Sequence, residues 1–291
     1  MSLITNIIVK VIMSIYHSAK LSKFDVGIVR SPGPGLGNLM FPVARAIIQS
    51  EKSGNIMVSP TWTQLKIGPF LRREKDKRLY LNEFSRRSLF EWKVWFKTLF
   101  LTTVEESRLL SDISHTDNYV VRYEGLGDYF KDIYDGRDLI KAWIDKNAQK
   151  DGEILESYNV ACHVRLGDFG AEEGPDNKQG HVVRQSWVWY RQAIDEAVKL
   201  SNISNPKIYL FTDESHASVV EQLNLPYEVI QDPSKNAITA IINMSRANIL
   251  VTSKSTFSQW AAFISDGRAI WNHNFNLTET FPVRVDQDIF L

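Results

Sequence analysis

A basic and an acidic side chain stand together in His163-Val164-Arg165-Leu166-Gly167-Asp168, directly after the β-prone run 158–164. In open α/β sheets, ligands bind at the carboxyl ends of strands. An arginine there keeps its charge and offers a planar fork of donors that suits phosphate. The hexapeptide therefore indicates an anion site centred on Arg165. On these residues alone, a surface arginine paired with Asp168 on a solvated loop explains the pattern equally well.

A glycine-rich loop, Gly33-Pro-Gly35-Leu-Gly37-Asn38, separates the apolar stretch Val26–Arg30, an expected strand, from an expected helix. We expect Asn38 to cap this helix, which runs to about Ser50. Such a loop can bring backbone N–H groups and a positive helix end to a phosphate. The alternative is a plain strand-to-helix turn. The glycine spacing matches neither a dinucleotide fingerprint nor a Walker loop.

Hydroxyl groups crowd the start of another expected helix, in the segment Thr252–Phe257. One hydroxyl suffices to cap a helix. The others among Ser253, Ser255 and Thr256 are therefore available to donate to a phosphate at the helix N-terminus. The alternative is an overbuilt cap with no ligand.

Strand and helix signals alternate beyond the polar stretch Lys146–Ser157, which indicates parallel strands joined by right-handed crossovers. The expected strands are 158–164, 207–211, 227–230, 248–252 and 269–271, and the expected helices begin at 186 and span 216–223, 237–246 and 255–264. Upstream we expect a strand at 55–60 and then a helical, aromatic region to about Lys150. The sequence predicts an α/β fold of two Rossmann-like doubly wound domains, 1–150 and 151–291, that face each other across a cleft.

Composition narrows the function classes. The formal net charge of the 291 residues is zero, which argues against a nucleic-acid binder that relies on bulk positive charge. The single cysteine, Cys162, excludes an intrachain disulfide. Its neighbour His163 points to the opposite face of a strand, so we expect a buried structural thiol rather than a nucleophile–base pair. No Cys/His cluster is present and Asp286-Gln-Asp288 has the character of a tail, so we expect no metal.

Two segments combine apolar and basic residues. Leu3–Ile15 is too short and too polar to span a bilayer, and it lacks the features of a signal peptide. It favours a short amphipathic helix that packs on the protein, with contact to a membrane or a partner as the alternative. In Arg86–Phe100 we expect the aromatic stripe to be buried in the first domain. The alternative there is an interfacial helix that meets a lipid-linked acceptor.

Three segments, taken in order, resemble the α-1,2-fucosyltransferase family of GDP-fucose-using glycosyltransferases. The family's Gly-Gly-Leu-Gly-Asn-Gln-Met-Phe resembles Gly33–Phe41, offset by a proline, and its His-x-Arg-Arg-Gly-Asp-Tyr resembles His163–Phe169. Its Ser-Asn-Ser-Thr-Phe-Ser-Trp-Trp-Ala-Ala resembles Ser253-Lys-Ser-Thr-Phe-Ser-Gln-Trp-Ala-Ala262. Leu39 and Leu166 depart from the glutamine and the second arginine of these motifs. The resemblance implies a GT-B fold and a metal-independent, inverting transfer of fucose from GDP-fucose to a sugar hydroxyl of a glycan.

The resemblance also implies roles in donor binding. Arg165 would hold the donor β-phosphate, and His163 would approach the guanosine. The pyrophosphate would lie against the hydroxyl-rich helix start, and the glycine loop would approach the phosphate from the first domain. The donor-binding residues expected in these two segments are Ser253, Ser255, Thr256, Gly35, Gly37 and Asn38.

Catalysis needs a carboxylate that takes the acceptor's proton. In the related α-1,6-fucosyltransferases, a catalytic glutamate follows the motif histidine by a spacing that falls here at Glu173. The neighbouring Glu172 and Asp176 share its loop, and an acidic loop of this kind is also typical of a merely solvated surface. Asp168 is the other catalytic candidate, and we expect it to orient Arg165.

The implied partners are a GDP-sugar donor and a glycan or lipid-linked oligosaccharide acceptor, with no cofactor, metal or nucleic acid. Leu166 leaves two alternatives open: transfer of another GDP-linked deoxyhexose, or a non-catalytic nucleotide-sugar-binding protein. Golgi members of the family carry an N-terminal anchor that is not evident here. We therefore expect a cytoplasmic enzyme, with peripheral contact to the inner face of the membrane as an open question.

Overall fold

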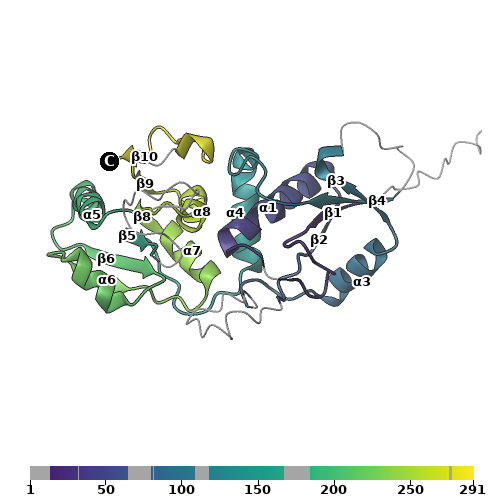
Figure 1. The fold of residues 1–291 in the computed structure, drawn as a ribbon, viewed down its shortest axis with the longest axis horizontal. Helices are drawn as coiled ribbons and strands as arrows, with labels where there is room; N and C mark the ends of the chain where they lie inside the picture. The colour runs from purple at the N-terminus through teal and green to yellow at the C-terminus, as the bar shows by residue number, and fades with distance from the viewer. Residues whose placement is uncertain are drawn as a thin grey trace, which may run out of the picture.

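The computed structural model describes residues 14–31, 33–64, 80, 82–108, 118–166, 184–274 and 277–291. These residues form two parallel β-sheets with flanking helices, arranged side by side (Figure 1). Every strand of the first sheet precedes residue 150, and every strand of the second follows residue 151. The expected α/β class, with two Rossmann-like units in a GT-B-type arrangement, is confirmed. The boundary near residue 150 stays a prediction.

The first sheet has the order β2-β1-β4-β3 and is parallel throughout. Its strands are β1 (Ile15–Ala19), β2 (Ile56–Val58), β3 (Thr102–Glu105) and β4 (Tyr119–Tyr123). Helix α1 (Leu36–Ser53) packs on one face of the sheet, and α3 (Leu89–Thr98) packs on the other beside β2. Side chains of each strand alternate between these two faces, as the pleat requires.

The second sheet has the order β10-β9-β8-β5-β6-β7 and is also parallel. Its strands are β5 (Tyr158–Val164), β6 (Lys207–Thr212), β7 (Glu228–Gln231), β8 (Ala247–Val251), β9 (Arg268–Trp271) and β10 (Asp288–Phe290). Its helices are α5 (Trp187–Ser201), α6 (His216–Leu223), α7 (Ala237–Ser245) and α8 (Thr256–Ile264), while α4 (Arg137–Asn147) lies between the two units (Figure 1). The elements expected between 158 and 271 are confirmed to within two residues at each end.

Three expectations for the first half are wrong. The β-prone stretch Val26–Arg30 is not a strand: it belongs to a loop in which Arg30 is buried and donates from Nε to the Thr61 carbonyl at 3.0 Å. Ile15, the last residue of the expected N-terminal helix, begins β1 instead, and residues 3–13 lie outside the described residues. Gly35 is the N-cap of α1, so Asn38 lies inside its first turn.

The C-terminal end is also more ordered than its sequence indicated. The tail interpretation is wrong for Asp288, which is buried and begins β10. Its carboxylate accepts a hydrogen bond from Trp271 Nε1 at 3.0 Å and pairs with Arg284 at 2.8 Å. A buried carboxylate needs such partners to offset its desolvation. Asp288 therefore serves the fold, whereas Asp286 is exposed.

The two units share a hydrophobic core in which α1 meets α8. The rings of Phe41 and Trp260 lie 5.1 Å apart between centroids, and both side chains are fully buried. Phe130 and Phe263 complete the cluster, again without exposed surface of any size. Full burial of one such side chain contributes roughly 1.5–3 kcal/mol. The two units are therefore joined by one continuous hydrophobic core.

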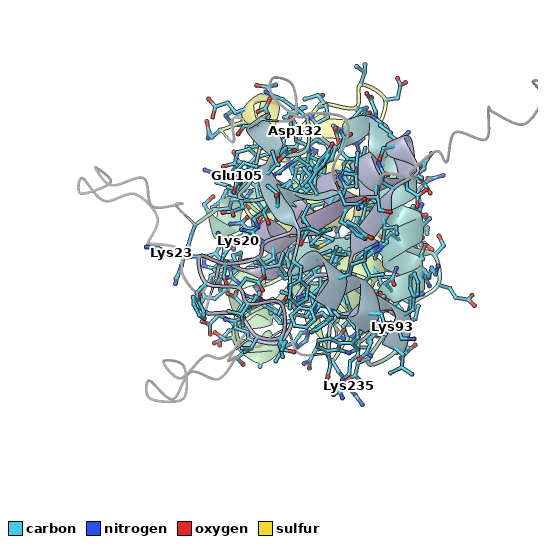
Figure 2. The ribbon with its side chains drawn as sticks, turned by 90° about the vertical axis from the view of Figure 1, so that its right-hand side faces the viewer. Lys20, Lys23, Lys93, Glu105, Asp132 and Lys235 are labelled. Carbon is cyan, nitrogen blue, oxygen red and sulfur yellow. The ribbon has the colours of Figure 1, made fainter. Side chains whose placement is uncertain are left out.

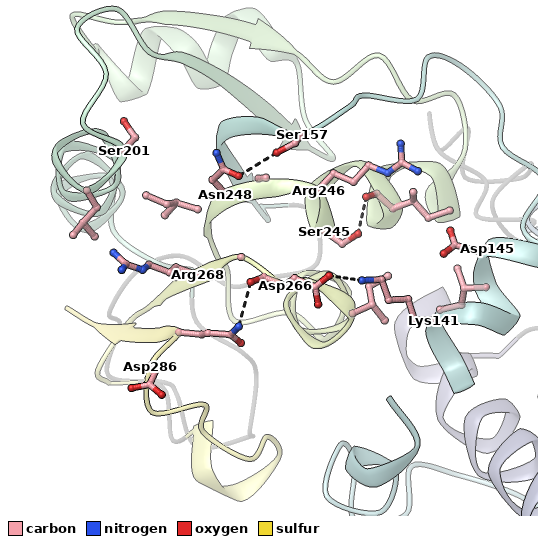
Figure 3. A pocket seen from close by; sticks show the side chains of 18 residues that line it. Lys141, Asp145, Ser157, Ser201, Ser245, Arg246, Asn248, Asp266, Arg268 and Asp286 are labelled. Atoms are coloured by element: carbon pink, nitrogen blue, oxygen red, sulfur yellow. Dashed lines mark hydrogen bonds and ion pairs between the residues drawn. The ribbon is translucent and has the colours of Figure 1, made fainter. Parts of the chain in front are cut away.

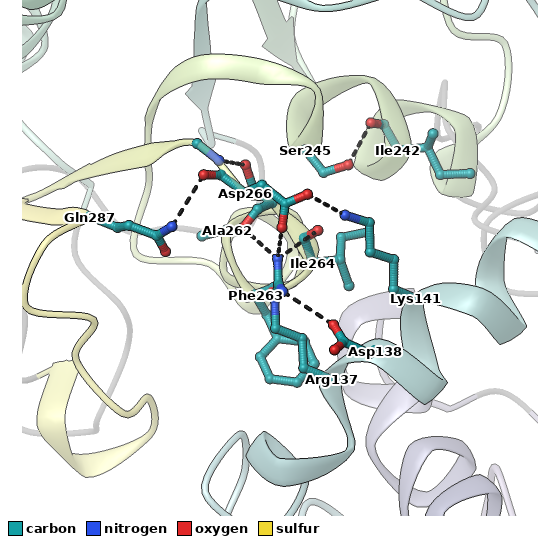
Figure 4. A network of polar contacts seen from close by, with 12 residues as sticks. Arg137, Asp138, Lys141, Ile242, Ser245, Ala262, Phe263, Ile264, Asp266 and Gln287 are labelled. Atoms are coloured by element: carbon teal, nitrogen blue, oxygen red, sulfur yellow. Dashed lines mark hydrogen bonds and ion pairs between the residues drawn. The ribbon is translucent and has the colours of Figure 1, made fainter.

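A polar clamp supports the same interface at the carboxyl end of α8. From the start of α4, Arg137 donates to the carbonyls of Phe263 at 2.7 Å and Ser265 at 2.9 Å (Figure 4). It also pairs with Asp266, which accepts from Lys141 at 2.6 Å, and both contacts lower the pKa of the Asp266 carboxyl. Basic side chains that bond the last carbonyls of a helix stabilise its end. Arg137 therefore fixes α8 against the first unit.

The aromatic stripe of α3 is not buried. Val94 is the buried side chain of this helix, whereas Leu89, Phe90 and Phe96 are exposed. Figure 2 faces this end of the molecule, where Lys93 of α3 is labelled. The expectation of burial is therefore wrong. Within the described ranges, no helix is long and apolar enough to cross a membrane.

Candidate active site

The second sheet reverses its direction of growth between β5 and β8. Strands β6 and β7 extend it beyond β5, whereas β9 and β10 extend it beyond β8. Open parallel sheets bind ligands in the crevice outside the carboxyl ends of the strands at such a switch point. Arg165 follows β5 directly, and Ser255 follows β8. The fold therefore brings two of the predicted segments to the place where a ligand is expected.

His163 bridges the two strands that border this switch point. Its Nδ1 atom lies 2.8 Å from the hydroxyl of Ser253, and its ring packs 5.4 Å from that of Phe257. Burial, together with the positive charge of Arg165, lowers the pKa of His163 to about 3, against an opposing effect of Asp213. The imidazole is therefore neutral, and its hydrogen bond to Ser253 links the ends of the two strands. Its expected approach to guanosine stays a prediction.

Arg165 is oriented by a carboxylate that the sequence analysis missed. Its Nη1 atom lies 2.9 Å from Oδ2 of Asp213, and the other carboxylate oxygen accepts the Leu166 amide at 3.0 Å. Asp213 follows β6, the strand next to β5. An acidic residue at the end of an expected strand was the available signal. Asp168 and Glu173 lie outside the described residues, so their roles stay predictions.

Leu166 belongs to the core of the second unit. It is only 9% exposed and packs in the hydrophobic cluster that contains Trp189 and Tyr190. A guanidinium in this position would have to leave the cluster to reach water or a ligand. Leu166 is therefore a packing residue, and it supplies no charge to the switch point.

The hydroxyls at the start of α8 have protein partners. Ser255 is the N-cap and accepts the Phe257 amide at 3.2 Å, while Ser253 bonds to His163. Thr256 donates to Oδ1 of Asn38 at 2.9 Å. Capping and contacts within the protein therefore explain part of this cluster of hydroxyl groups. A helix also leaves its first N–H groups without intrahelical acceptors, which keeps the start of α8 suited to an anion.

Gly37 allows the starts of α1 and α8 to touch. A Cβ atom on Gly37 would lie 2.8 Å from Thr256 Oγ1 and 3.1 Å from the Phe257 amide nitrogen, and the Gly37 carbonyl accepts Trp260 Nε1 at 2.6 Å. Gly35 has no such contact, because the nearest atom to its Cβ position is Tyr80 Oη at 3.7 Å. The glycine loop and the hydroxyl-rich helix start are therefore adjacent in space, as expected if both segments bind the same ligand.

A hollow of about 260 Å³ opens at the carboxyl ends of β1 and β4, which form the switch point of the first sheet. Lys20, Asn38 and Glu124 line it, and Lys20 pairs with Glu124 at 2.7 Å. Since Asn38 also bonds to Thr256 of α8, this hollow adjoins the switch point of the second sheet. The two units thus present their ligand-binding edges to each other.

A larger hollow of about 800 Å³ lies at the opposite, amino ends of β8 and β9 (Figure 3). Two pairs of its polar side chains bond each other: Lys141 pairs with Asp266, and Ser157 donates to Asn248. Ligands of parallel α/β sheets bind at the other edge. We therefore assign the chemistry to the smaller hollow and the switch point beside it. Among the residues that the structure describes, no group of three His, Cys, Asp or Glu could hold a metal ion.

Comparison with known proteins shows the family of the chain. Residues 5–291 match the family model described as Glycosyl transferase family 11. The chain belongs to glycosyl transferase family 11. The family resemblance drawn from the three motifs is therefore confirmed, and the protein is a glycosyltransferase. No curated protein matches it.

Several solved structures are similar to this family 11 chain. NodZ α-1,6-fucosyltransferase co-crystallised with GDP is 14% identical with a TM-score of 0.47, over 90% of this chain and 96% of NodZ. Fucosyltransferase NodZ from Bradyrhizobium is 14% identical with a TM-score of 0.44, over 87% and 94%. POFUT1 in complex with GDP is 12% identical with a TM-score of 0.45, over 87% and 95%.

The buried histidine gives the family 11 protein a testable pH dependence. An unfolded chain takes up a proton on this residue near pH 6.5, whereas folded His163 resists protonation down to about 3. Its contribution to stability is therefore complete above pH 6.5 and is lost as the pH falls toward 3, by up to about 1.4 kcal/mol per pH unit. Urea unfolding at a series of pH values should show a shallower pH slope for His163→Gln than for the wild type. The exposed His273→Gln is the matched control, and equal slopes for all three proteins would contradict the assignment.

Proposed function

We propose that this glycosyltransferase transfers fucose from GDP-fucose to a sugar hydroxyl of a glycan or lipid-linked oligosaccharide, with formation of an α-1,2 linkage. The observation that carries the proposal is the meeting of three motif segments at one place. Arg165 directly follows β5, the start of α8 follows β8, and Asn38 joins that helix from the first unit. Together they bring a guanidinium and the positive end of a helix to one place, as a sugar-diphosphate donor needs.

The proposed reaction is a single displacement at C1 of fucose, without a metal ion. The acceptor oxygen forms the new bond to C1 as the C1–O bond to the β-phosphate breaks, so the configuration at C1 inverts. The bonding electrons leave with GDP, and the acceptor proton passes to a carboxylate. Negative charge grows on the β-phosphate, where Arg165 and the N–H groups at the start of α8 can stabilise it. Asp213 holds the guanidinium in position for this role.

A second positive charge is available from Lys254. This residue stands where the family motif has asparagine, between Ser253 and the N-cap Ser255. It is half-buried, and burial lowers the pKa of its ammonium group. A nearby diphosphate would restore the charged form. We infer that Lys254 contributes the charge that the motif's second arginine would otherwise supply, since Leu166 lies in the core.

The acceptor has a matching place in the first unit. The hollow beside Asn38 contains the Lys20–Glu124 pair, and charged side chains of this kind hydrogen-bond sugar hydroxyls readily. We place the acceptor sugar there, facing the donor across the Asn38–Thr256 contact. The proposal puts the enzyme in the cytoplasm, where its one buried, reduced cysteine is ordinary.

Donor chemistry is tested through Arg165. With GDP-fucose and a glycan acceptor, the wild type should release GDP and form a fucosylated product. Arg165→Ala should lower the rate by about 100-fold, which corresponds to loss of roughly 3 kcal/mol of charge stabilisation. The measurement is GDP release together with product detection by mass spectrometry, and the exposed Arg268→Ala is the control. Unchanged turnover by folded Arg165→Ala, or stabilisation in a thermal shift by UDP rather than GDP, would contradict the proposal.

Two alternatives are separated by the same assay. If another GDP-linked deoxyhexose reacts and GDP-fucose does not, the donor assignment fails while the site assignment holds. A protein that binds GDP but never releases it from any GDP-sugar would be a non-catalytic nucleotide-sugar-binding protein.

The proposed base is Glu173. Glu173→Gln should bind GDP-fucose with unchanged affinity and lose transfer by 100-fold or more, on the order of the effect of a general base. Calorimetric binding of GDP-fucose and turnover, measured on the same preparation, test this. Glu172→Gln is the matched control, because it changes the adjacent carboxylate. Full activity of Glu173→Gln would rule the residue out, and Asp168→Asn would then be the next variant to measure.

The role of Lys254 predicts a charge-specific effect. Lys254→Gln should weaken donor binding and turnover by about tenfold, on the scale of one half-exposed charge contact, and Lys254→Arg should retain most of both. Kinetics with varied GDP-fucose provide the measurement. Lys235→Gln, at an exposed position of the same unit, is the control. Equal kinetics for Lys254→Gln and the wild type would remove this lysine from the donor site.

A further inference from the structure

More than half of the large apolar side chains that are exposed in the described residues lie at one end of the first unit. Of 16 large apolar residues that are exposed in the described ranges, nine lie on α3 and its flanks or on the loop before α1. They are Phe24, Val26, Ile28, Leu89, Phe90, Trp92, Phe96, Leu99 and Phe100. We call this set the α3 surface. Isolated exposed apolar residues are ordinary, but a concentrated patch of this kind marks an interaction site.

Helix α3 presents its aromatic side to the outside. Leu89, Phe96 and Phe100 follow one another at spacings of seven and four residues, which places them on a single stripe. Phe100 is 75% exposed and Phe96 is 58% exposed, and their rings contact each other at 5.4 Å. The opposite side of the helix, with Val94, packs on the sheet. The stripe is therefore a surface feature and not part of a core.

The loop and the helix form one continuous surface. A Cβ atom on Gly27 would fall within 3 Å of the Trp95 ring, so the loop lies directly on α3. Arg87 ties the two together, because it donates to the Gly27 carbonyl and lies 5.2 Å from the Trp92 ring. A capping box between Ser88 and Glu91 fixes the start of the helix. The exposed aromatic groups thus stand on a rigid support.

Cationic side chains lie on the same segments as these aromatic groups. Arg86, Lys93 and Lys97 on the α3 segment are exposed, as is Lys23 beside Phe24. Figure 2 labels Lys93 and Lys23 at this end of the molecule. The one acidic residue of the helix, Glu91, is already bonded to Ser88 and Ser59. The α3 surface therefore combines exposed Phe, Trp and Leu with an excess of positive charge.

The positive charge of the α3 surface favours an anionic bilayer over a second copy of the chain as its partner. Two copies of this chain that met through their α3 surfaces would bring Arg86, Lys93 and Lys97 against the same residues of the other copy, and such like-charge contacts are unfavourable. An anionic bilayer complements the pattern instead, because its headgroups attract Lys and Arg while Phe, Trp and Leu enter the boundary between headgroups and acyl chains.

We propose that the α3 surface docks the protein on the interface of an anionic lipid bilayer. Docking through α3 is a function separate from the transfer reaction, and it rests on the arrangement of the first unit alone. It would hold the enzyme as a peripheral protein, with α3 lying in the plane of the interface and the second unit away from the lipid (Figure 1).

Vesicle flotation of the full chain tests the proposal. The protein should float with vesicles of phosphatidylcholine and phosphatidylglycerol and bind about tenfold less to phosphatidylcholine alone, and added salt should weaken the binding. Phe96→Glu/Phe100→Glu should lower partition to the anionic vesicles at least tenfold, and Arg86→Glu/Lys93→Glu should remove the preference for phosphatidylglycerol. Val188→Glu/Val285→Glu, at exposed apolar positions of the second unit, is the matched control and should bind like the wild type.

Other outcomes would overturn the proposal. Absence of flotation by the wild type would do so, as would equal binding by Phe96→Glu/Phe100→Glu, because the affinity would then reside elsewhere in the chain. A concentration-dependent dimer that the same variant abolishes, seen by sedimentation velocity without vesicle binding, would assign the surface to a second copy. Turnover with a water-soluble acceptor should be the same for all these variants, so failure of docking can be distinguished from failure of the transfer reaction.

Discussion

The contact between the first turns of α1 and α8 determines where the rest of the candidate site lies. Gly37 leaves room for Thr256 and accepts Trp260, and Asn38 bonds to Thr256 one residue further along. These residues belong to two of the three family motifs. The same contact therefore packs the two units together and brings the hollow beside Asn38 to the switch point of the second sheet. A side chain at position 37 would disturb both the packing of the two units and the approach of these two places. The close contact, rather than a positive φ, therefore explains why this residue is glycine.

Helix α8 is held at both ends by the first unit. Its start meets α1, and its last carbonyls accept hydrogen bonds from Arg137 of α4. Its position relative to β5 is also fixed, because His163 bonds to Ser253 just before the helix. A neutral, buried imidazole suits this role, since a charged one would repel Arg165.

The sequence predicted the second unit well because its central strands β5 and β8 are largely buried apolar runs. Three of its helices also begin at capping side chains, Ser186, Asn236 and Ser255. The first unit was harder. Strand β1 contains the polar residues His17 and Ser18, so its sequence lacks the apolar pattern of a strand. The stretch Val26–Arg30 has strand-like composition, but buried Arg30 holds it in a loop. Arg165 was predictable from its place at a strand end. Asp213 was not paired with it, because the order of strands in the sheet cannot be read from chain order.

The shared aromatic core has a consequence for how this family 11 chain can be divided. Phe41 and Phe130 come from the first unit, and Trp260 and Phe263 come from the second, yet each ring is buried by the others. Either half alone would expose an aromatic face to water. The two Rossmann-like halves are therefore not interchangeable modules: a chimera that joins halves of different relatives must carry over α1 and α8 as a matched pair.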